Sequence, residues 1–304
     1  MVVRFPLLLV VFIIAAAAAI IFLALGDNPA RAVLGEAHSV DHRGVAVQYY
    51  INAPISTDVG ADIGVNVETD TVVFLASYAR SGSDFNELVS VLNRAGYHTL
   101  VLQARGVGGS ELPALDLTLF DYAGDLKSVL DQERIAAPIT LVGHAFGNRI
   151  ARAFASRFPD RVRSLVLLAA GDGAPPPAVR NDIFKILLGF WPESGRRDAL
   201  RRAFFAGDNS VPAHWLNGWY PRAGLAQGRA TANTPLSQWM GGGGVPMLVV
   251  QPTEDAAAAE GGGKLRRRYA DRVTLLHLEG AGHAVLPEQP EAVSRILLEH
   301  LEAY

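Results

Sequence analysis

Residues 141–148 read LVGHAFGN, and this stretch decides the prediction of the fold. An apolar run leads into it, and Gly143 and Gly147 frame His144, Ala145 and Phe146 before a helical pattern that runs to residue 158, where Pro159 ends it. Glycine accepts the backbone angles of a sharp turn and lets a helix approach a strand closely. The stretch therefore predicts a strand, a tight turn centred on position 145, and a helix.

Apolar runs and helical patterns alternate on both sides of this turn. Strands separated by helices form βα units, which build a mostly parallel sheet. The alternation stops between about residues 172 and 244, where helical patterns carry all 4 tryptophans of the chain. We therefore predict an α/β fold with a mostly parallel central sheet flanked by helices, spanning 45–304, with an inserted helical cap at about 172–244. The strands are predicted at 45–51, 71–76, 98–102, 139–142, 164–168, 247–251 and 273–278.

Two local patterns make further predictions. Asp84, with Glu87 three residues later, predicts a capping box that begins a helix ending near Arg94. The glycine runs at 241–244 and 261–263 are interpreted as flexible loops, and the first is interpreted as a hinge where the cap rejoins the sheet.

Residues 1–26 predict a membrane anchor or a signal peptide, followed by a linker over 27–44. The stretch 7–25 carries no charge, and as a helix it would span about 28 Å, close to the hydrocarbon thickness of a bilayer. A cleaved secretory signal and a buried core helix are the alternatives. Because Arg4 precedes the stretch and acidic residues outnumber Arg31 after it, the positive-inside rule places the globular domain on the non-cytoplasmic side. Recovery of this protein in the soluble cytosolic fraction of the cell would refute this prediction.

Composition excludes several classes of function. The chain has 27 basic and 30 acidic residues, a formal net charge of -3, so it lacks the basic excess typical of nucleic-acid-binding proteins. It has 0 cysteines, which excludes disulfides, thiolate nucleophiles and cysteine metal sites. No His, Asp or Glu cluster has metal-ligand spacing, and no Walker or G-x-G-x-x-G pattern follows a strand. We therefore predict no metal and no nucleotide cofactor.

Four segments together resemble the α/β-hydrolase superfamily over about residues 45–304. The turn at 143–147 resembles the nucleophile elbow G-x-S-x-G, with Ala145 where that family has its nucleophile. Residues 71–81 and 103–110 are similar to the strand with the oxyanion loop and to the later R-G-x-G-x-S turn. The segment ending in Asp255 (MLVVQPTED) resembles the strand before the family's acid, and Gly280-Ala281-Gly282-His283 resembles the loop that holds its histidine.

The resemblance implies a role for each of these positions. His283 would act as the base and Asp255 would orient it, while Ala145 occupies the nucleophile position without supplying a nucleophile. The backbone N–H groups of Phe146 and Tyr78 would hold the oxyanion, although Ala76-Ser77 replaces the usual His-Gly before Tyr78. Two further residues have alternative interpretations. Asp172 lies where some members carry another acid, and His144 is interpreted either as packing beside the elbow or as catalytic.

Ala145 has no lone pair, so an acyl-enzyme at this position is chemically impossible. Three interpretations stay open. In the first, His283 and Asp255 activate water or a substrate proton directly. In the second, the protein is an inactive pseudo-hydrolase that binds a small ligand, and in the third it is a serine hydrolase silenced by an engineered Ser-to-Ala substitution. The aromatic-rich cap favours a small apolar molecule of ester or carbonyl type as the substrate or ligand.

Overall fold

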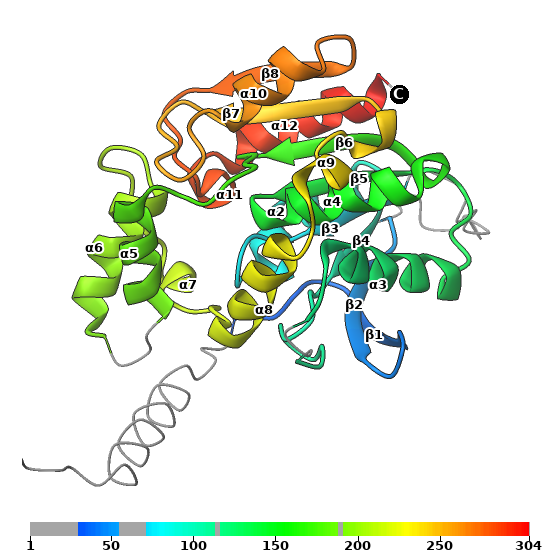
Figure 1. The fold of residues 1–304 in the computed structure, drawn as a ribbon, viewed down its shortest axis with the longest axis horizontal. Helices are drawn as coiled ribbons and strands as arrows, with labels where there is room; N and C mark the ends of the chain where they lie inside the picture. Colours follow the sequence, from blue (N-terminus) through cyan, green and yellow to red (C-terminus); the bar gives the residue numbers. More distant parts are fainter. Residues whose placement is uncertain (1–29, 55–70, 113–115, 188–190, 304) are drawn as a thin grey trace, which may run out of the picture.

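The structure is a computed structural model that describes residues 30–54, 71–112, 116–187 and 191–303. Its centre is an eight-stranded sheet in the order β1-β2-β4-β3-β5-β6-β7-β8 (Figure 1). From β4 to β8 in this order all neighbours are parallel, whereas β1 and β2 pair antiparallel with each other and β2 pairs antiparallel with β4. The predicted mostly parallel sheet is therefore confirmed. The strands are β1 Glu36–Asp41, β2 Ala46–Asn52, β3 Thr71–Leu75, β4 His98–Leu102, β5 Ile139–His144, β6 Val162–Leu168, β7 Met247–Pro252 and β8 Val273–Leu278.

Helices cover both faces of the sheet. Side chains of β3 alternate between two apolar cores, with Val73 and Leu75 in one and Val72 and Phe74 in the other. Because both faces are buried, a central strand reads as an unbroken apolar run rather than as an alternating one. The first core is shared with α3 (Leu119–Gln132), α4 (Phe146–Arg157) and α10 (Gly261–Arg268), and the second with η1 (Gly82–Phe85), α2 (Asn86–Arg94), α11 (Val285–Glu288) and α12 (Pro290–Glu302).

The region between β6 and β7 is helical and forms a third apolar core. In Figure 1 the first three helices of this region lie beside the sheet, and α8 runs back toward it. This core includes Ala79 and Ala284, which belong to loops that follow β3 and β8. The last two elements, α9 and η3, pack against α4 instead. The helices are α5 Pro177–Leu187, α6 Glu193–Phe204, α7 Ala213–Leu216, α8 Pro221–Ala232, α9 Leu236–Trp239 and η3 Gly242–Gly244; η2, Pro159–Arg161, precedes β6.

The segment predicted as a linker, 27–44, contains strand β1. Glu36 pairs with Ile51 and Asp41 with Ala46 of β2. The sequence EAHSVD gave no strand signal because this edge strand is polar and mostly exposed. The predicted anchor or signal peptide at 1–26 lies outside the described residues and stays a prediction. Within 30–303, leaving out the gaps given above, no helix is both long and apolar enough to cross a bilayer.

The two glycine runs are not the flexible loops that their composition suggested. Gly242–Gly244 forms the short helix η3, and Gly261 begins α10. A Cβ atom added to Gly243 would lie 1.9 Å from the carbonyl oxygen of Ala155, and one added to Gly261 would lie 1.7 Å from that of Ala170. Glycine is required here for close packing, because any side chain would collide with the backbone of a neighbouring element.

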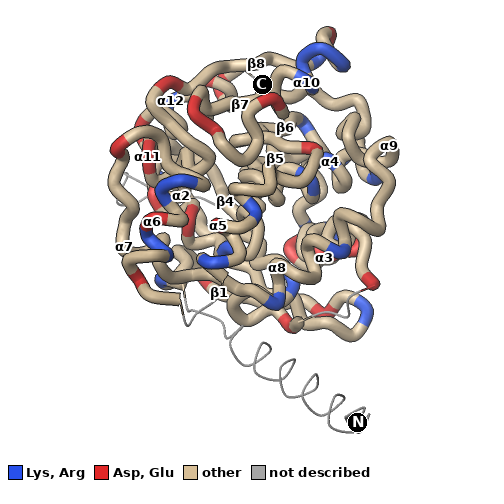
Figure 2. The backbone as a smooth tube through the Cα atoms, turned by 60° about the vertical axis from the view of Figure 1, so that its left-hand side comes forward, with Lys and Arg blue, Asp and Glu red and all other residues tan. Residues whose placement is uncertain are grey.

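Charged residues of both signs are interspersed over the molecule (Figure 2). The densest basic run, Arg266-Arg267-Arg268, lies on the exposed face of α10. Its arginines face solvent, as expected for a solvated helix face.

We predict that Gly261→Ala destabilises the protein by about 2 kcal/mol, because a backbone collision of this kind forces α10 away from the loop after β6. Gly263→Ala in the same helix is the matched control. Its added methyl group would meet the flexible Arg267 side chain at 3.3 Å, and alanine favours the helix by up to about 1 kcal/mol over glycine. Equal melting temperatures for the two variants in thermal denaturation would contradict the close-packing explanation.

Candidate active site

The turn between β5 and α4 has the strained backbone that the sequence predicted. Ala145 has φ 48° and ψ -103°, a conformation that costs a residue with a Cβ atom about 1–3 kcal/mol. A Cβ atom on Gly147 would lie 1.9 Å from the carbonyl oxygen of Leu75, and one on Gly143 would lie 2.6 Å from the amide nitrogen of Asn148. The two glycines thus let α4 begin directly beside the end of β3. This geometry exists without a hydroxyl group at position 145.

His283 and Asp255 form a buried pair although 28 residues separate them. Asp255 follows β7 and His283 follows β8, so two adjacent parallel strands bring them to the same edge of the sheet. Nδ1 of His283 lies 3.0 Å and 3.1 Å from the two carboxylate oxygens of Asp255. Because a carboxylate accepts, we assign the proton to Nδ1, which leaves Nε2 free to accept a proton.

The carboxylate of Asp255 is held in its ionised form. Its Oδ1 accepts the backbone N–H groups of Ala257 at 2.9 Å and Ala258 at 2.7 Å. Burial acts to raise the pKa of Asp255, but His283 and these N–H groups outweigh burial and keep the pKa below its usual value. Asp172, the alternative acid, instead lies 3.6 Å from Nζ of Lys264. The geometry therefore joins Asp255, not Asp172, to His283.

A cavity of about 580 Å³ brings the predicted positions together. His283, Ala145, Phe146 and Tyr78 all line it, as does Ser77. Among the described residues, the backbone N–H groups of Phe146 and Tyr78 have no hydrogen-bond acceptor in the protein. They are therefore available to an oxygen of a ligand. Phe146 also begins α4, where the helix dipole favours negative charge.

His144 does not reach the cavity but supports the backbone of the histidine loop. It is fully buried, and its Nε2 donates to the carbonyl oxygen of His283 at 2.7 Å. Burial and the neighbouring His283 lower the pKa of His144 to about 4, so its imidazole is neutral near pH 7. Of the two interpretations of this residue, the contacts fit packing and support of the His283 loop.

Phe204 of the cap and Glu288 of α11 fix the histidine loop as well. The ring of Phe204, at the end of α6, stacks on the ring of His283 with a centroid distance of 5.5 Å. The carboxylate of Glu288 accepts from the N–H of Gly282 at 2.8 Å and from the N–H of Ala206 at 2.7 Å, so it links the loop to the chain just after α6. Burial raises the pKa of Glu288 although these donors oppose the shift. Neither residue stands out in a local pattern, because the contacts of Phe204 with His283 and of Glu288 with Ala206 join residues that are distant along the chain.

The cap also holds the loop that carries Tyr78. The side chain of Gln227 accepts the N–H of Ala79 at 2.7 Å, and the N–H of Tyr220 donates to the carbonyl oxygen of Ala79 at 2.9 Å. The backbone of Arg80, the next residue in this loop, pairs with that of Trp219 in an isolated β-bridge. Helix α8 and the segment before it therefore set the position of the predicted oxyanion loop.

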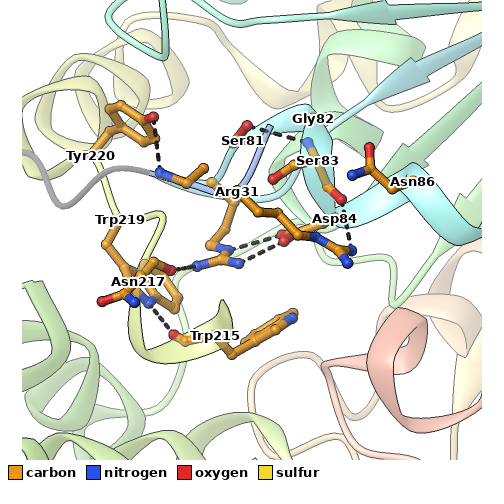
Figure 3. Close-up of polar contacts among 12 residues, drawn as sticks. Arg31, Ser81, Gly82, Ser83, Asp84, Asn86, Trp215, Asn217, Trp219 and Tyr220 are labelled. Atoms are coloured by element: carbon orange, nitrogen blue, oxygen red, sulfur yellow. Dashed lines mark hydrogen bonds and ion pairs between the residues drawn. The ribbon is translucent and has the colours of Figure 1, made fainter. Parts of the chain in front are cut away.

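The side chain of Arg80 contacts residues of the cap, and Figure 3 labels its partners Asp84, Trp215, Asn217 and Trp219. Its guanidinium lies 4.6 Å and 4.7 Å from the ring centroids of Trp215 and Trp219 and donates to the carbonyl oxygen of Asn217 at 2.6 Å. It also makes a bidentate ion pair with Asp84, at 2.6 Å and 2.9 Å. The predicted capping box at Asp84 is therefore wrong, because this carboxylate is engaged by Arg80 and the hydroxyl of Ser81 caps the short helix η1 instead.

The cap tryptophans act as structural anchors. Trp215 and Trp219 enclose Arg80, and Trp239 stacks on the guanidinium of Arg152 at 4.6 Å. None of the tryptophans is among the described residues that line the cavity; its aromatic lining comes from Tyr78, Phe146, Phe184 and Phe204. Over the same described ranges, no group of three or more His, Asp or Glu side chains could hold a metal ion.

Comparisons with known proteins agree with this architecture. A sequence model described as "Alpha/beta hydrolase family" matches residues 72–296. A 2-hydroxy-6-oxononadienedioate/2-hydroxy-6-oxononatrienedioate hydrolase of Paraburkholderia xenovorans (strain LB400) is 32% identical over 136 residues, which are 43% of this chain and 47% of that protein. The chain spans from about a fifth to about half of the length of the curated relatives it matches.

Solved structures share the fold at low sequence identity. A bromoperoxidase from Bacillus anthracis superposes with a TM-score of 0.70 at 19% identity, covering 88% of this chain and 100% of that chain. A membrane phospholipase A, described as a bacterial virulence factor, superposes with a TM-score of 0.67 at 18% identity, covering 98% of this chain and 97% of that chain.

We predict that His144 makes stability depend on pH. In the unfolded chain a histidine takes up a proton near pH 6.5, whereas in the folded protein the pKa of His144 is about 4. Protonation therefore favours unfolding, and the stability present above pH 6.5 is lost as the pH falls toward 4. His144→Gln keeps a donor for the carbonyl oxygen of His283 but does not titrate. Between pH 7.5 and pH 5.0, the variant should lose about 2 kcal/mol less stability than the natural protein.

Urea denaturation at the two pH values measures this difference. His277→Gln, which replaces a solvent-exposed imidazole, is the matched control and should behave like the natural protein. A His144→Gln variant whose stability falls with pH as steeply as that of the natural protein would show that His144 is not buried in its neutral form.

Proposed function

This chain belongs to the alpha/beta hydrolase family, and we propose that it hydrolyses a small, largely apolar ester or related carbonyl compound with water activated by His283. The observation that carries the proposal is the intact His283–Asp255 pair, at 3.0 Å, beside a cavity that also exposes Ala145, Phe146 and Tyr78. A base, with its orienting carboxylate behind it, and two free N–H donors thus belong to one cavity. The nucleophilic hydroxyl is the part that position 145 lacks.

The reaction needs one water molecule and no covalent enzyme intermediate. His283 Nε2 takes a proton from water while the water oxygen bonds to the carbonyl carbon, and the N–H groups of Tyr78 and Phe146 receive the negative charge on the carbonyl oxygen. Asp255 stabilises the imidazolium that forms. The tetrahedral intermediate then expels the alcohol, which takes the proton from His283, and a carboxylic acid is left. Ester and water are consumed in equal amounts, so atoms and charge balance.

The typical rate contributions of a general base and of oxyanion donors support activity without a serine. General-base catalysis typically raises the reaction rate by about 10²–10⁴-fold. Removal of one oxyanion donor from a serine hydrolase lowers kcat by about 10²–10³-fold, so each such donor contributes a rate factor of this size. The methyl group of Ala145 also occupies less space than a serine side chain would. Water can therefore approach the carbonyl carbon from the side that the hydroxyl would fill.

The cavity lining supports an apolar substrate. Ile183, Phe184 and Leu187 of α5 and Leu225 of α8 line the cavity. Phe184 is 60% exposed and Leu225 is 52% exposed, so part of this apolar lining is open to solvent. The Paraburkholderia relative is named as a hydrolase of an oxo compound, which supports hydrolysis at a carbonyl-type centre.

The second candidate function is binding without turnover. Ala145 itself favours it, because a family member that lacks the nucleophile has lost the usual covalent route. In this case the cavity retains its ligand while the His283–Asp255 pair serves only to hold the loops in place. An engineered replacement of serine at position 145 is the third alternative, and it predicts the same absence of turnover.

Hydrolysis assays with a panel of esters and lactones distinguish the hypothesis of an enzyme from that of a binding protein. The natural protein should hydrolyse at least one neutral apolar member, and His283→Ala should lower kcat/KM by about 10²-fold or more, the lower end of general-base contributions. Initial rates with purified protein provide the measurement. Background rates that are equal for the natural protein and for His283→Ala would end the enzyme hypothesis.

Two controls make the assay specific. His277→Ala changes an exposed histidine of β8 and should retain the natural rate. Ser77→Ala removes the serine hydroxyl that lines the cavity; if water is the nucleophile, this variant keeps most of the activity. A loss with Ser77→Ala as large as that with His283→Ala would instead identify Ser77 as the attacking group.

A further inference from the structure

Two arginines of α4, the half-buried Arg149 and the fully buried Arg152, have no ion-pair partner among the described residues. Nη2 of Arg149 donates to the carbonyl oxygen of Gly173 at 2.7 Å, and Nη2 of Arg152 donates to that of Gly171 at 2.8 Å. In the part of the chain that the structure describes, no carboxylate lies within 4.0 Å of either guanidinium. Nη1 of Arg152 is buried and has no hydrogen-bond partner there. The guanidinium of Arg152 has therefore lost its hydration, and that of Arg149 has lost part of it, without an ion pair to a described residue in return.

The absence of an ion pair leaves the pKa values of both guanidinium groups lowered. Burial lowers the pKa of Arg152 to about 9, and the charge of Arg149 lowers it further while Asp172 opposes the shift. Burial also lowers the pKa of Arg149 although Asp172 raises it. A buried cation is costly unless it is paired and hydrogen-bonded. A negative charge brought near Arg149 would offset that cost.

Arg149 lies in the wall of the cavity on the same side of α4 as position 145. Residues four apart in a helix lie on one face, and long side chains lean toward the helix N-terminus. Arg149 follows Ala145, the N-cap of α4, by one helical turn, which is about 6 Å along the helix axis, and both residues line the cavity. A ligand held by the guanidinium and by the N–H group of Phe146 therefore needs to span only about one helical turn.

Positive charge is in excess at this end of the cavity. Arg149 and Arg180 line it, whereas Asp172 is the one carboxylate among the described lining residues. Asp172 has its own cation, because Nζ of Lys264 is 3.6 Å from its carboxylate. The rest of the cavity is mostly apolar. The surroundings thus fit a ligand with an apolar body and one negatively charged end.

We propose that Arg149 binds a carboxylate of the substrate, so that this protein acts on apolar molecules that carry one carboxylate a few bonds from the reacting carbonyl group. The planar guanidinium of arginine matches the two oxygens of a carboxylate, which gives direction as well as attraction. This inference rests on the proposed function, because it names the substrate class of the same cavity. It adds an anionic subsite to the apolar lining.

Ligand binding tests the inference without requiring turnover. The probes are 4-phenylbutanoate and 4-phenylbutanamide, which share shape and apolar body and differ in charge, titrated into the natural protein by calorimetry at low salt. The carboxylate should bind about tenfold or more tightly than the amide, as expected for a partly desolvated charge pair. Raising the ionic strength should weaken binding of the carboxylate and leave that of the amide unchanged.

Variants of α4 locate the subsite. Arg149→Met keeps the length of the side chain but removes its charge, so the preference for the carboxylate over the amide should fall to about twofold or less, whereas Arg149→Lys should retain part of it. Arg157→Met is the matched control, because Arg157 is exposed at the end of the same helix, and it should keep the full preference. Circular dichroism establishes that each variant is folded.

Equal affinity of the natural protein for the two probes would overturn the inference, and this comparison needs no variant. Binding of neither probe would overturn it as well, as would a full preference retained in folded Arg149→Met. The proposed function fails on a different result, namely ester hydrolysis that does not depend on His283. A protein that prefers the carboxylate but hydrolyses nothing would keep the anionic subsite and lose the hydrolase.

Discussion

The close approach of α4 to the end of β3 is the constraint on which the site depends. Gly147 touches the carbonyl oxygen of Leu75 so tightly that no side chain fits there, and this contact holds Ala145 in a backbone conformation that alanine rarely adopts. Such strain persists only where the surroundings fix it from several sides. As a result the N-terminus of α4 faces the loop after β3, and Phe146 and Tyr78 line one cavity. The position of the missing hydroxyl is thus preserved although the hydroxyl itself is not.

The cap is part of this arrangement rather than a separate cover. It contacts the loop after β3 through Gln227 and Tyr220, and it contacts the histidine loop through Phe204 and through the N–H of Ala206, which donates to Glu288 of α11. Both loops that supply chemistry are therefore held from the sheet side and from the cap side. Precise positioning is what a base and oxyanion donors require to act on water. This two-sided support makes the site a candidate catalyst despite its missing nucleophile.

Much of the fold could be predicted from the sequence, because buried strands and amphipathic helices leave local patterns. Strand β8 has the predicted bounds, and the order of elbow, acid and histidine placed Asp255 and His283 correctly beside each other. Local patterns fail where an element is polar or where its contacts are distant along the chain. Strand β1 is polar and exposed, so its pairing with β2 left no trace in its hydrophobicity. The glycine runs resemble linkers in composition, although Gly243 and Gly261 pack directly against the backbone of neighbouring segments. The place of Arg149 in the cavity wall has no local sequence pattern, because it follows from the tertiary structure.

The central claim, that position 145 still faces a competent His283–Asp255 pair, is tested most directly by giving the turn its hydroxyl group. Ala145→Ser should be labelled by a p-nitrophenyl alkylphosphonate, with the label found by mass spectrometry on the peptide containing position 145 and lost when His283→Ala is added. The natural protein should carry no label on that peptide. A folded Ala145→Ser variant that the phosphonate does not modify would contradict the geometry on which this account rests.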